Sequence, residues 1–313
     1  MAKSDSRERE VKRGSEAAYA RPVSRGRTHA HRWDTVRGLG AALLVAAPVL
    51  LGVAYSVAGA VGLTGVGARG FSLERAHHVL GERIVWQSIA FTLWYAAAAT
   101  GLATAAAVTV AALFRRGDRA GRVAHWLAIA PLPVPYVVAA AVGLLILGQS
   151  GFIARALYAL RLSASPADMA PLVYDGRGVG LIVTLAWKEF PFLALVAFSL
   201  LSTRAAALEE AARTLGASAW QTFARVTLPL LWRGLLPAIT AVFIFVVGSY
   251  EASALLGPSD PIAFPVLTLE RYDALDLSQR ADAYVLGLIG MVVALIAIVL
   301  HEWTRARAER LRG

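Results

Sequence analysis

The stretch from Glu209 to Pro229 reads EEAARTLGASAWQTFARVTLP and lies between two long apolar segments. Residues 206–215 are rich in helix formers, and Thr203 is available as an N-cap before them. Gly216 can take the left-handed conformation that ends a helix. A second short helix is then expected over 217–225, with the closing proline stopping it before the next apolar segment. The sequence therefore predicts a polar helix–turn–helix lying against a membrane.

The composition is that of a membrane protein. The chain has 313 residues, 57% of them hydrophobic, and apolar runs of about 20 residues recur along it. It contains no Cys, which excludes a disulfide framework, a thiol nucleophile and a thiolate metal site. We therefore expect an all-α, polytopic membrane protein.

Apolar segments long enough to cross a membrane occur six times. We expect six transmembrane helices at residues 38–63, 85–114, 126–147, 179–201, 235–256 and 284–303.

The span over 85–114 is rich in Ala, Thr and Gly, so we expect it to pack closely against another helix of the same chain. A short interfacial helix is expected before it, over 72–87. Residues 1–37 are predicted to be a disordered basic tail, 38–303 the six-span domain, and 304–313 a second basic tail.

The distribution of basic residues predicts the orientation. Of the 31 Lys and Arg residues, 22 lie in the two tails, in the loop 114–126 and in the loop 202–234 between the fourth and fifth spans. A six-span topology places these four segments on one side, which the positive-inside rule identifies as the cytosol. The net charge of +10 then needs no nucleic-acid partner.

The third apolar segment contains Pro131, Pro133 and Pro135. Proline lacks a backbone N–H and clashes with the preceding turn, so three prolines must break or kink the helix. We interpret the break as a candidate hinge or gate. The alternative is a span that begins late, near Val134.

We single out three charged residues within the expected spans: Lys188 and Glu189 in the fourth, and Glu251 near the outer end of the fifth. A charge at the bilayer centre costs about 2.5–3.5 kcal/mol on insertion scales, so these residues should face the bundle interior. Lys188 and Glu251 have similar depths in adjacent spans and could reach each other. Two interpretations stay open, a translocation pathway that contacts the solute or an intramembrane ion pair.

The quoted stretch resembles the EAA loop of permease subunits in bacterial ATP-binding-cassette (ABC) importers. That loop has Glu-Ala-Ala, three residues, Gly, nine residues, an aliphatic residue, one residue and Leu-Pro. The chain matches it with residues 210–212, Gly216, Val226 in place of the usual Ile, and 228–229. The segment from Trp187 to Phe192, WKEFPF, also resembles the span before this loop. The resemblance covers about residues 37–303.

The resemblance implies the fold of a type I ABC importer permease (MetI-like) with a cytosolic coupling-helix loop at 203–229. It assigns docking of a separate ATP-binding subunit to Glu210, Ala211, Ala212, Thr214, Leu215 and Gly216. ATP and Mg would bind two copies of that subunit. The chain lacks G-x-x-x-x-G-K-[ST] and a recognisable nucleophile–base set, so we expect that it is not an enzyme and does not hydrolyse ATP by itself. We also expect no cofactor and no metal in this chain.

Further partners follow from the same resemblance. It implies a second permease and a periplasmic or lipid-anchored binding protein. We expect the second permease to be a different chain rather than a second copy of this one. It also implies the bacterial cytoplasmic (inner) membrane, with both termini cytosolic. The run 220–239 resembles permeases for polyamines, thiamine, iron, sulfate and molybdate, and our expectation for the solute is a polyamine, thiamine, iron or similar.

Two other classes of protein stay open. A secondary transporter would need ion ligands within the membrane and often has inverted repeats, neither of which is visible. A membrane enzyme would need His, Asp or Glu clustered at one membrane face, and the six His residues are scattered.

Overall fold

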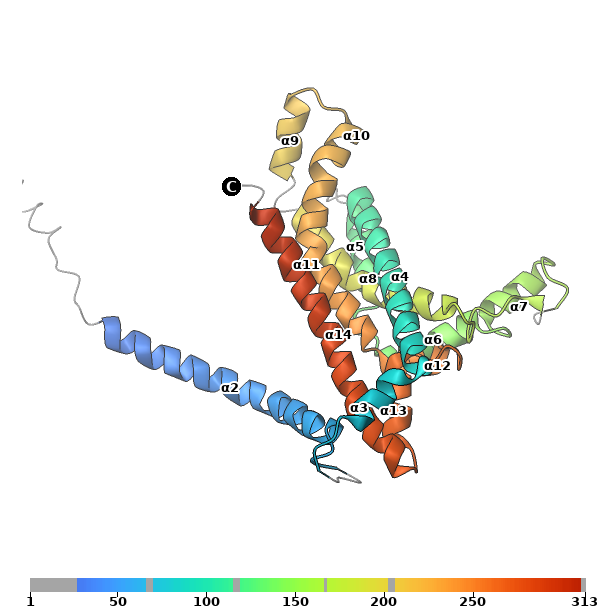
Figure 1. Ribbon diagram of the computed structural model, residues 1–313. Coiled ribbons are helices and arrows are strands. Elements are labelled where there is room, and N and C mark those ends of the chain that lie inside the picture. The colour runs from blue at the N-terminus through green and yellow to red at the C-terminus, as the bar shows by residue number, and fades with distance from the viewer. Residues whose placement is uncertain (1–26, 66–69, 115–118, 166–167, 202–205, 311–313) are drawn as a thin grey trace, which may run out of the picture. The chain divides into compact units, whose positions relative to one another are not determined.

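The computed structural model describes residues 27–65, 70–114, 119–165, 168–201 and 206–310 (Figure 1). Within these residues the regular structure is helical, which confirms the all-α expectation. The helices are α2 (Arg27–Ala60), α3 (Glu74–Gly81), α4 (Arg83–Phe114), α5 (Arg119–Ile129), α6 (Tyr136–Leu147), α7 (Phe152–Ala159), α8 (Val179–Leu200), α9 (Ala206–Thr214), α10 (Ala219–Thr222), the π-helical segment η3 (Phe223–Thr227), α11 (Leu228–Val247), α12 (Tyr250–Leu256), α13 (Phe264–Asp273) and α14 (Leu277–Arg310).

Six helical stretches among the described residues are long and apolar enough to cross a membrane. They are Gly40–Ala60, Arg83–Phe114, Tyr136–Ala159, Val179–Leu200, Ala219–Val247 and Leu277–Trp303. The number of spans therefore agrees with the prediction.

The chain divides into two units, residues 1–54 and 55–313. The first unit holds most of α2, whose apolar side chains are largely exposed within the chain, as expected of a helix that faces lipid or another protein. Residues 1–26 of the predicted disordered tail 1–37 lie outside the described residues. The prediction is wrong for residues 27–37, which form the first turns of α2. In the second unit, α14 ends at the same end of the bundle as α9 and α10, and α13 lies at the other (Figure 1).

The third span begins later than expected. α5 ends at Ile129, α6 begins at Tyr136, and the candidate span starts there and not at Trp126. The intervening prolines explain the break, because Pro135 cannot donate a backbone hydrogen bond and instead serves as the N-cap of α6 with φ −60° and ψ 149°. The late start that the sequence left open is therefore the correct boundary.

The fifth span begins earlier than expected. The prediction that Pro229 stops a helix before this span is wrong, since α10, η3 and α11 follow one another without a gap. Pro229 lies in the first turn of α11, where a missing N–H disturbs the helix least. The outer end differs too, because α11 ends at Val247 and a separate helix, α12, carries Glu251.

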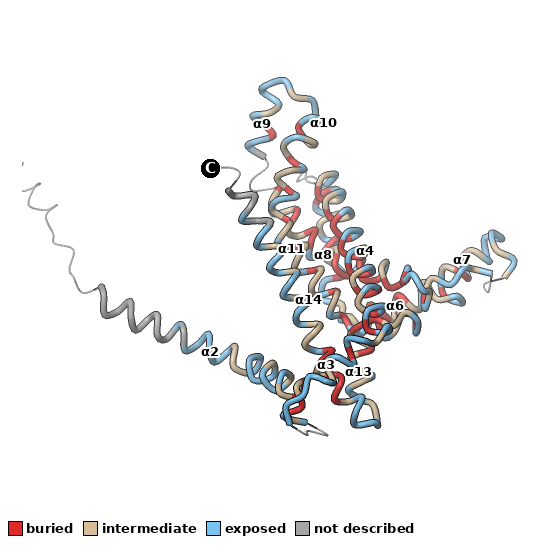
Figure 2. The backbone as a smooth tube through the Cα atoms, viewed as in Figure 1, coloured by how far each residue is buried: buried red, intermediate tan, exposed pale blue. Residues whose placement is uncertain are grey.

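The interior of the second unit is built around α4 and α8, which pack along each other. α4 carries a row of fully buried alanines that includes Ala96, Ala99 and Ala103. Figure 2 shows buried residues along α4 and α8. Because alanine adds little bulk, the two backbones approach closely. This arrangement confirms the expected close packing of the second span within the chain.

The contact between α6 and α8 depends on Gly143. A Cβ atom at this position would clash with the side chain of Thr184, whereas a Cβ at Gly101 on α4 would meet nothing within 4 Å. We expect Gly143→Ala to lower the free energy of unfolding by about 1–3 kcal/mol, as overpacking typically does. Gly101→Ala should leave the stability unchanged or raise it by up to about 1 kcal/mol, because Ala favours the helix.

Thermal unfolding of both variants in the same detergent would test this prediction. Equal unfolding midpoints for Gly143→Ala and Gly101→Ala would show that α6 and α8 can move apart to accommodate a methyl group without loss of stability.

Candidate functional site

The loop between α8 and α11 folds as the sequence predicts around Gly216. α9 ends at Thr214, and Gly216 takes φ +85° in the left-handed region. Its N–H donates to the carbonyl of Arg213 at 2.9 Å, and the N–H of Ala217 donates to that of Ala212 at 3.1 Å. These bonds satisfy carbonyls that the end of a helix leaves open. The expected N-cap, Thr203, lies outside the described residues.

The second short helix starts with a capping box. The N–H of Gln221 donates to Oγ of Ser218 at 3.2 Å, and the N–H of Ser218 donates to Oε1 of Gln221 at 2.9 Å. This reciprocal pair begins α10 at Ala219, two residues later than expected. From Phe223 to Thr227 the chain widens into the π-helical segment η3, which periodicity alone did not predict.

The residues predicted to dock a partner lie together at the tip of this helical hairpin. Glu210, Ala211, Thr214, Leu215 and Gly216 are exposed and Ala212 is partly exposed. Figure 2 shows α9 and α10 projecting from the bundle, mostly in the colour of exposed residues.

Large apolar side chains add to this exposed tip. Leu215 is 88% exposed and Trp220 is 73% exposed. Apolar side chains that gather on a surface indicate contact with another molecule. The sequence analysis included Leu215 but missed Trp220, although its place in the second helix was visible.

Lys188 and Glu189 of α8 are both buried, as we expected for charged side chains that face the bundle interior. The ammonium group of Lys188 donates to the carbonyl of Leu132 at 3.1 Å and to that of Pro131 at 3.5 Å. It also lies 4.7 Å from the ring centre of Tyr136, a cation–π distance. Lys188 therefore binds the backbone at the proline break.

The sequence left open whether Lys188 reaches Glu251, and the described residues show no ion pair between them. The physical reason is the break before α6, which leaves carbonyl groups without helical partners and so supplies acceptors to the ammonium group. Glu251 is exposed on α12.

Tyr136 is the residue of this cluster that the sequence analysis missed. Its hydroxyl donates to Oε1 of Glu189 at 2.6 Å, and its ring packs on Phe245 with centroids 4.9 Å apart. We name Tyr136, Lys188, Glu189 and Glu251 the membrane polar cluster. Tyr136 directly follows the last proline of the break, and that position was the available signal.

An ion-pair network joins three segments near the α13 end of the bundle. Arg271 of α13 contacts Glu82 at 2.5 Å and Asp282 of α14 at 3.4 Å, and Arg75 of α3 lies 3.9 Å from Asp282. His78, Glu82 and Asp282 lie close enough to share a metal ion. The two guanidinium groups of Arg271 and Arg75 already balance the two carboxylates, so the network has the character of a structural tie.

We expect Arg271→Met to lower the free energy of unfolding by about 1–3 kcal/mol, because the mostly buried carboxylate of Asp282 would lose its nearest cation. Arg177→Met removes the same charge from an exposed side chain and should change little. Chemical or thermal unfolding of the two variants compares them. Equal stabilities would mean that the network is a surface contact without energetic weight.

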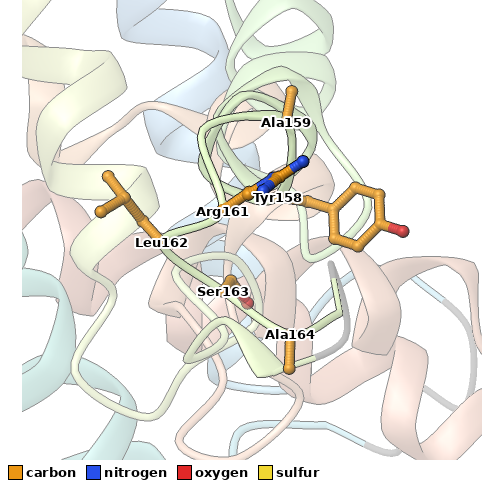
Figure 3. A pocket seen from close by; sticks show the side chains of 6 residues that line it. All are labelled: Tyr158, Ala159, Arg161, Leu162, Ser163 and Ala164. Carbon is orange, nitrogen blue, oxygen red and sulfur yellow. The ribbon is translucent and has the colours of Figure 1, made fainter.

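A shallow cavity of about 580 Å³ lies at the end of α7, lined by Tyr158, Ala159, Arg161, Leu162, Ser163 and Ala164 (Figure 3). Arg161 has φ 59°, and Oγ of Ser163 donates to the carbonyl of Ser165 at 2.6 Å. None of the sequence-predicted site residues lines this cavity.

Comparison with known proteins adds a family match and distant relatives. The family model described as "Binding-protein-dependent transport system inner membrane component" matches residues 99–310. The probable sulfate transport system permease protein cysT of Chlorella vulgaris is 30% identical over 122 residues, which are 39% of this chain and 46% of that protein. The molybdenum transport system permease protein ModB of Haemophilus influenzae is 27% identical over 184 residues, 58% of this chain and 76% of that protein.

Two solved structures share the fold. A bacterial ABC transporter involved in the import of the acidic polysaccharide alginate has a TM-score of 0.66 at 17% identity, over 89% of this chain and 94% of that chain. The bacterial alginate ABC transporter in complex with its pentasaccharide-bound periplasmic protein has a TM-score of 0.68 at 16% identity, over 89% and 96%. The curated relatives described here are named for sulfate and molybdenum, and they do not support the expected polyamine, thiamine or iron.

Proposed function

The chain belongs to the family of binding-protein-dependent transport system inner membrane components, and we propose that it forms one half of the translocation pathway of an ATP-driven importer. Three features support this proposal: the six candidate spans, the fold shared with alginate importers, and the exposed hairpin of α9 and α10. The exposed hairpin is the main support for the proposal, because it projects from the helical bundle and offers a surface that a partner outside the membrane can bind and move.

The hairpin is proposed to dock a separate ATP-binding subunit. Glu210, Ala211, Ala212, Thr214, Leu215 and Gly216 would form the contact surface. The small side chains of the two alanines allow the partner to approach the helix closely. Leu215 is exposed in the isolated chain and offers an apolar side chain for contact with the partner. ATP and Mg would bind to two copies of the partner, so this chain would supply coupling and no catalysis.

The membrane polar cluster is proposed to line or control the pathway. Lys188 and Glu189 of this cluster lie beside the break at Pro131, Pro133 and Pro135, where the backbone leaves helical geometry. Irregular backbone at membrane depth is tolerated where protein covers it or where it lines a water-filled cavity. A second permease, expected to be a distinct chain, would complete the pathway.

The orientation is proposed from charge. The loop that holds the hairpin and both tails carry most of the basic residues, which favours the cytosol for them. Both termini would then be cytosolic, and α13 would lie at the outer surface, where a binding protein delivers the solute.

For the solute we propose a small oxyanion as the first class to test, since the relatives reported above are named for sulfate and molybdenum transport. The decisive experiment is gentle extraction of the tagged chain from its native membrane, followed by mass spectrometry of the proteins that co-purify. We expect an ATP-binding subunit, a second permease and a binding protein, and the ligand of the binding protein would identify the solute.

Recovery of the chain alone, under conditions that hold other importers together, would contradict the proposal. Uptake that survives ATP depletion but stops with an uncoupler would instead support a secondary transporter.

A further inference from the structure

The two adjacent glutamates of the hairpin have opposite environments. Glu210 is exposed, as a residue that docks a partner should be, whereas Glu209 is only 7% exposed. The buried carboxylate accepts a hydrogen bond at 2.6 Å from the hydroxyl of Thr227, which is itself fully buried. Glu209 thus points away from the docking surface and into the hairpin.

This hydrogen bond joins two elements that are 18 residues apart in the chain. Glu209 belongs to α9, and Thr227 is the last residue of η3, directly before α11. Hydrogen bonds to a charged acceptor are stronger than those between neutral groups. The side chains therefore link the docking helix to the start of a membrane span.

The π-helical geometry of η3 positions the hydroxyl for this contact. The N–H of Leu228 bonds to the carbonyl of Phe223, five residues earlier, and Oγ1 of Thr227 also lies 3.5 Å from the carbonyl of Thr222. Single π turns inside α-helices are uncommon and occur frequently at functional sites. Here the wider turn occurs where the docking hairpin joins the span.

We propose that the Glu209–Thr227 hydrogen bond is the strut that transmits movement of α9 to α11, so that Glu209 is a positioning residue for coupling and no part of the docking surface. The inference rests on the proposed function. Without the strut, α9 remains joined to α10 and η3 by the turn at 215–218, by the Ser218 capping box and by the packing of α9 on these two elements, none of which is a side-chain hydrogen bond to the start of α11. α9 would then move with its partner while α11 stayed in place.

The experiment measures binding, hydrolysis and uptake in the complex purified from native membranes and reconstituted into vesicles. Glu209→Ala and Thr227→Val remove opposite ends of the strut. We expect each to retain the ATP-binding subunit and to hydrolyse ATP within twofold of the unchanged complex, while the solute taken up per ATP falls at least tenfold. Thr227→Ser keeps the hydroxyl and Glu209→Gln keeps an acceptor, so both should retain coupling.

A double variant, Glu209→Ala with Thr227→Val, tests whether the two residues act through their shared hydrogen bond or independently of each other. If the strut acts as one unit, the double variant loses no more uptake per ATP than either single variant. Additive losses would overturn the proposal, as would unchanged coupling in Thr227→Val.

Loss of the ATP-binding subunit from the Glu209→Ala complex would also overturn the proposal, since Glu209 would then belong to docking or to the fold. The proposed function fails separately, if the unchanged chain binds no ATP-binding subunit.

Discussion

Replacing Leu215 with aspartate is expected to abolish ATP-driven uptake while the protein still folds and inserts. Leu215 is 88% exposed just beyond the end of α9, so the substitution removes no internal contact. In the proposed complex the same side chain is buried against the ATP-binding subunit, and a new carboxylate there would be desolvated. We expect the loss to reach about 2 kcal/mol, the size of an interface hot spot, which corresponds to roughly 30-fold weaker binding.

A matched control lies at the other end of the molecule. Leu275, between α13 and α14, is 96% exposed, and Leu275→Asp makes the same chemical change away from the hairpin. We expect Leu275→Asp to retain the ATP-binding subunit and Leu215→Asp to lose it in co-purification. Retention of the subunit and of full uptake in Leu215→Asp would remove the hairpin from the coupling mechanism.

Gly216→Val provides an independent perturbation of the same tip. A Cβ at Gly216 meets nothing within 4 Å, so the expected cost comes from the positive φ alone and amounts to about 1–2 kcal/mol. Such strain is expected to distort the turn between α9 and α10 and to reduce uptake. Unchanged uptake in a normally inserted Gly216→Val protein would mean that the turn geometry is not required.

Local chemistry accounts for the features that the sequence predicted correctly. The six spans follow from runs of apolar residues, the break before Tyr136 follows from the prolines, and the end of α9 follows from Gly216. Each of these depends on residues that are neighbours in the chain, where backbone sterics and hydrophobic length decide the outcome.

Contacts between distant residues account for the features that the sequence analysis missed. Tyr136 reaches Glu189 across 53 positions, and Lys188 found carbonyl acceptors on the broken helix in place of Glu251. Likewise, the buried one of the two adjacent glutamates, Glu209, accepts a hydrogen bond from Thr227, which is 18 residues away. A one-dimensional pattern could place these residues in the correct spans but could not name their partners.

Replacing Lys188 with methionine is expected to reduce uptake at least tenfold. The change removes the donor that binds the carbonyls of Pro131 and Leu132 and leaves Glu189 buried without its neighbouring cation. Leaving such groups unpaired lowers the free energy of unfolding by about 1–3 kcal/mol. Reduced uptake of the single variant alone would therefore fit both the pathway and a purely structural role.

The neutral double variant, Lys188→Met with Glu189→Gln, separates these two roles. It removes the uncompensated charge, and a buried charged group replaced together with its neighbour often costs little stability. The hydroxyl of Tyr136 can still donate to the amide oxygen at position 189. We expect the unfolding midpoint to recover the part that was lost to the unpaired charge, although the carbonyls of Pro131 and Leu132 still lack their donor. Uptake should stay low, because a pathway needs the charges themselves.

Glu251→Gln completes the argument, because Glu251 is exposed and its neutralisation should leave the stability unchanged. A pathway that uses this carboxylate loses uptake in Glu251→Gln, whereas a structural cluster confined to Lys188 and Glu189 does not. If the neutral double variant recovers both uptake and stability, and Glu251→Gln keeps full uptake, the role of the cluster is structural. It then only holds α8 against the proline break. Low uptake in both variants, with normal unfolding midpoints and normal ATP-binding-subunit recovery, would place these charges on the route of the solute.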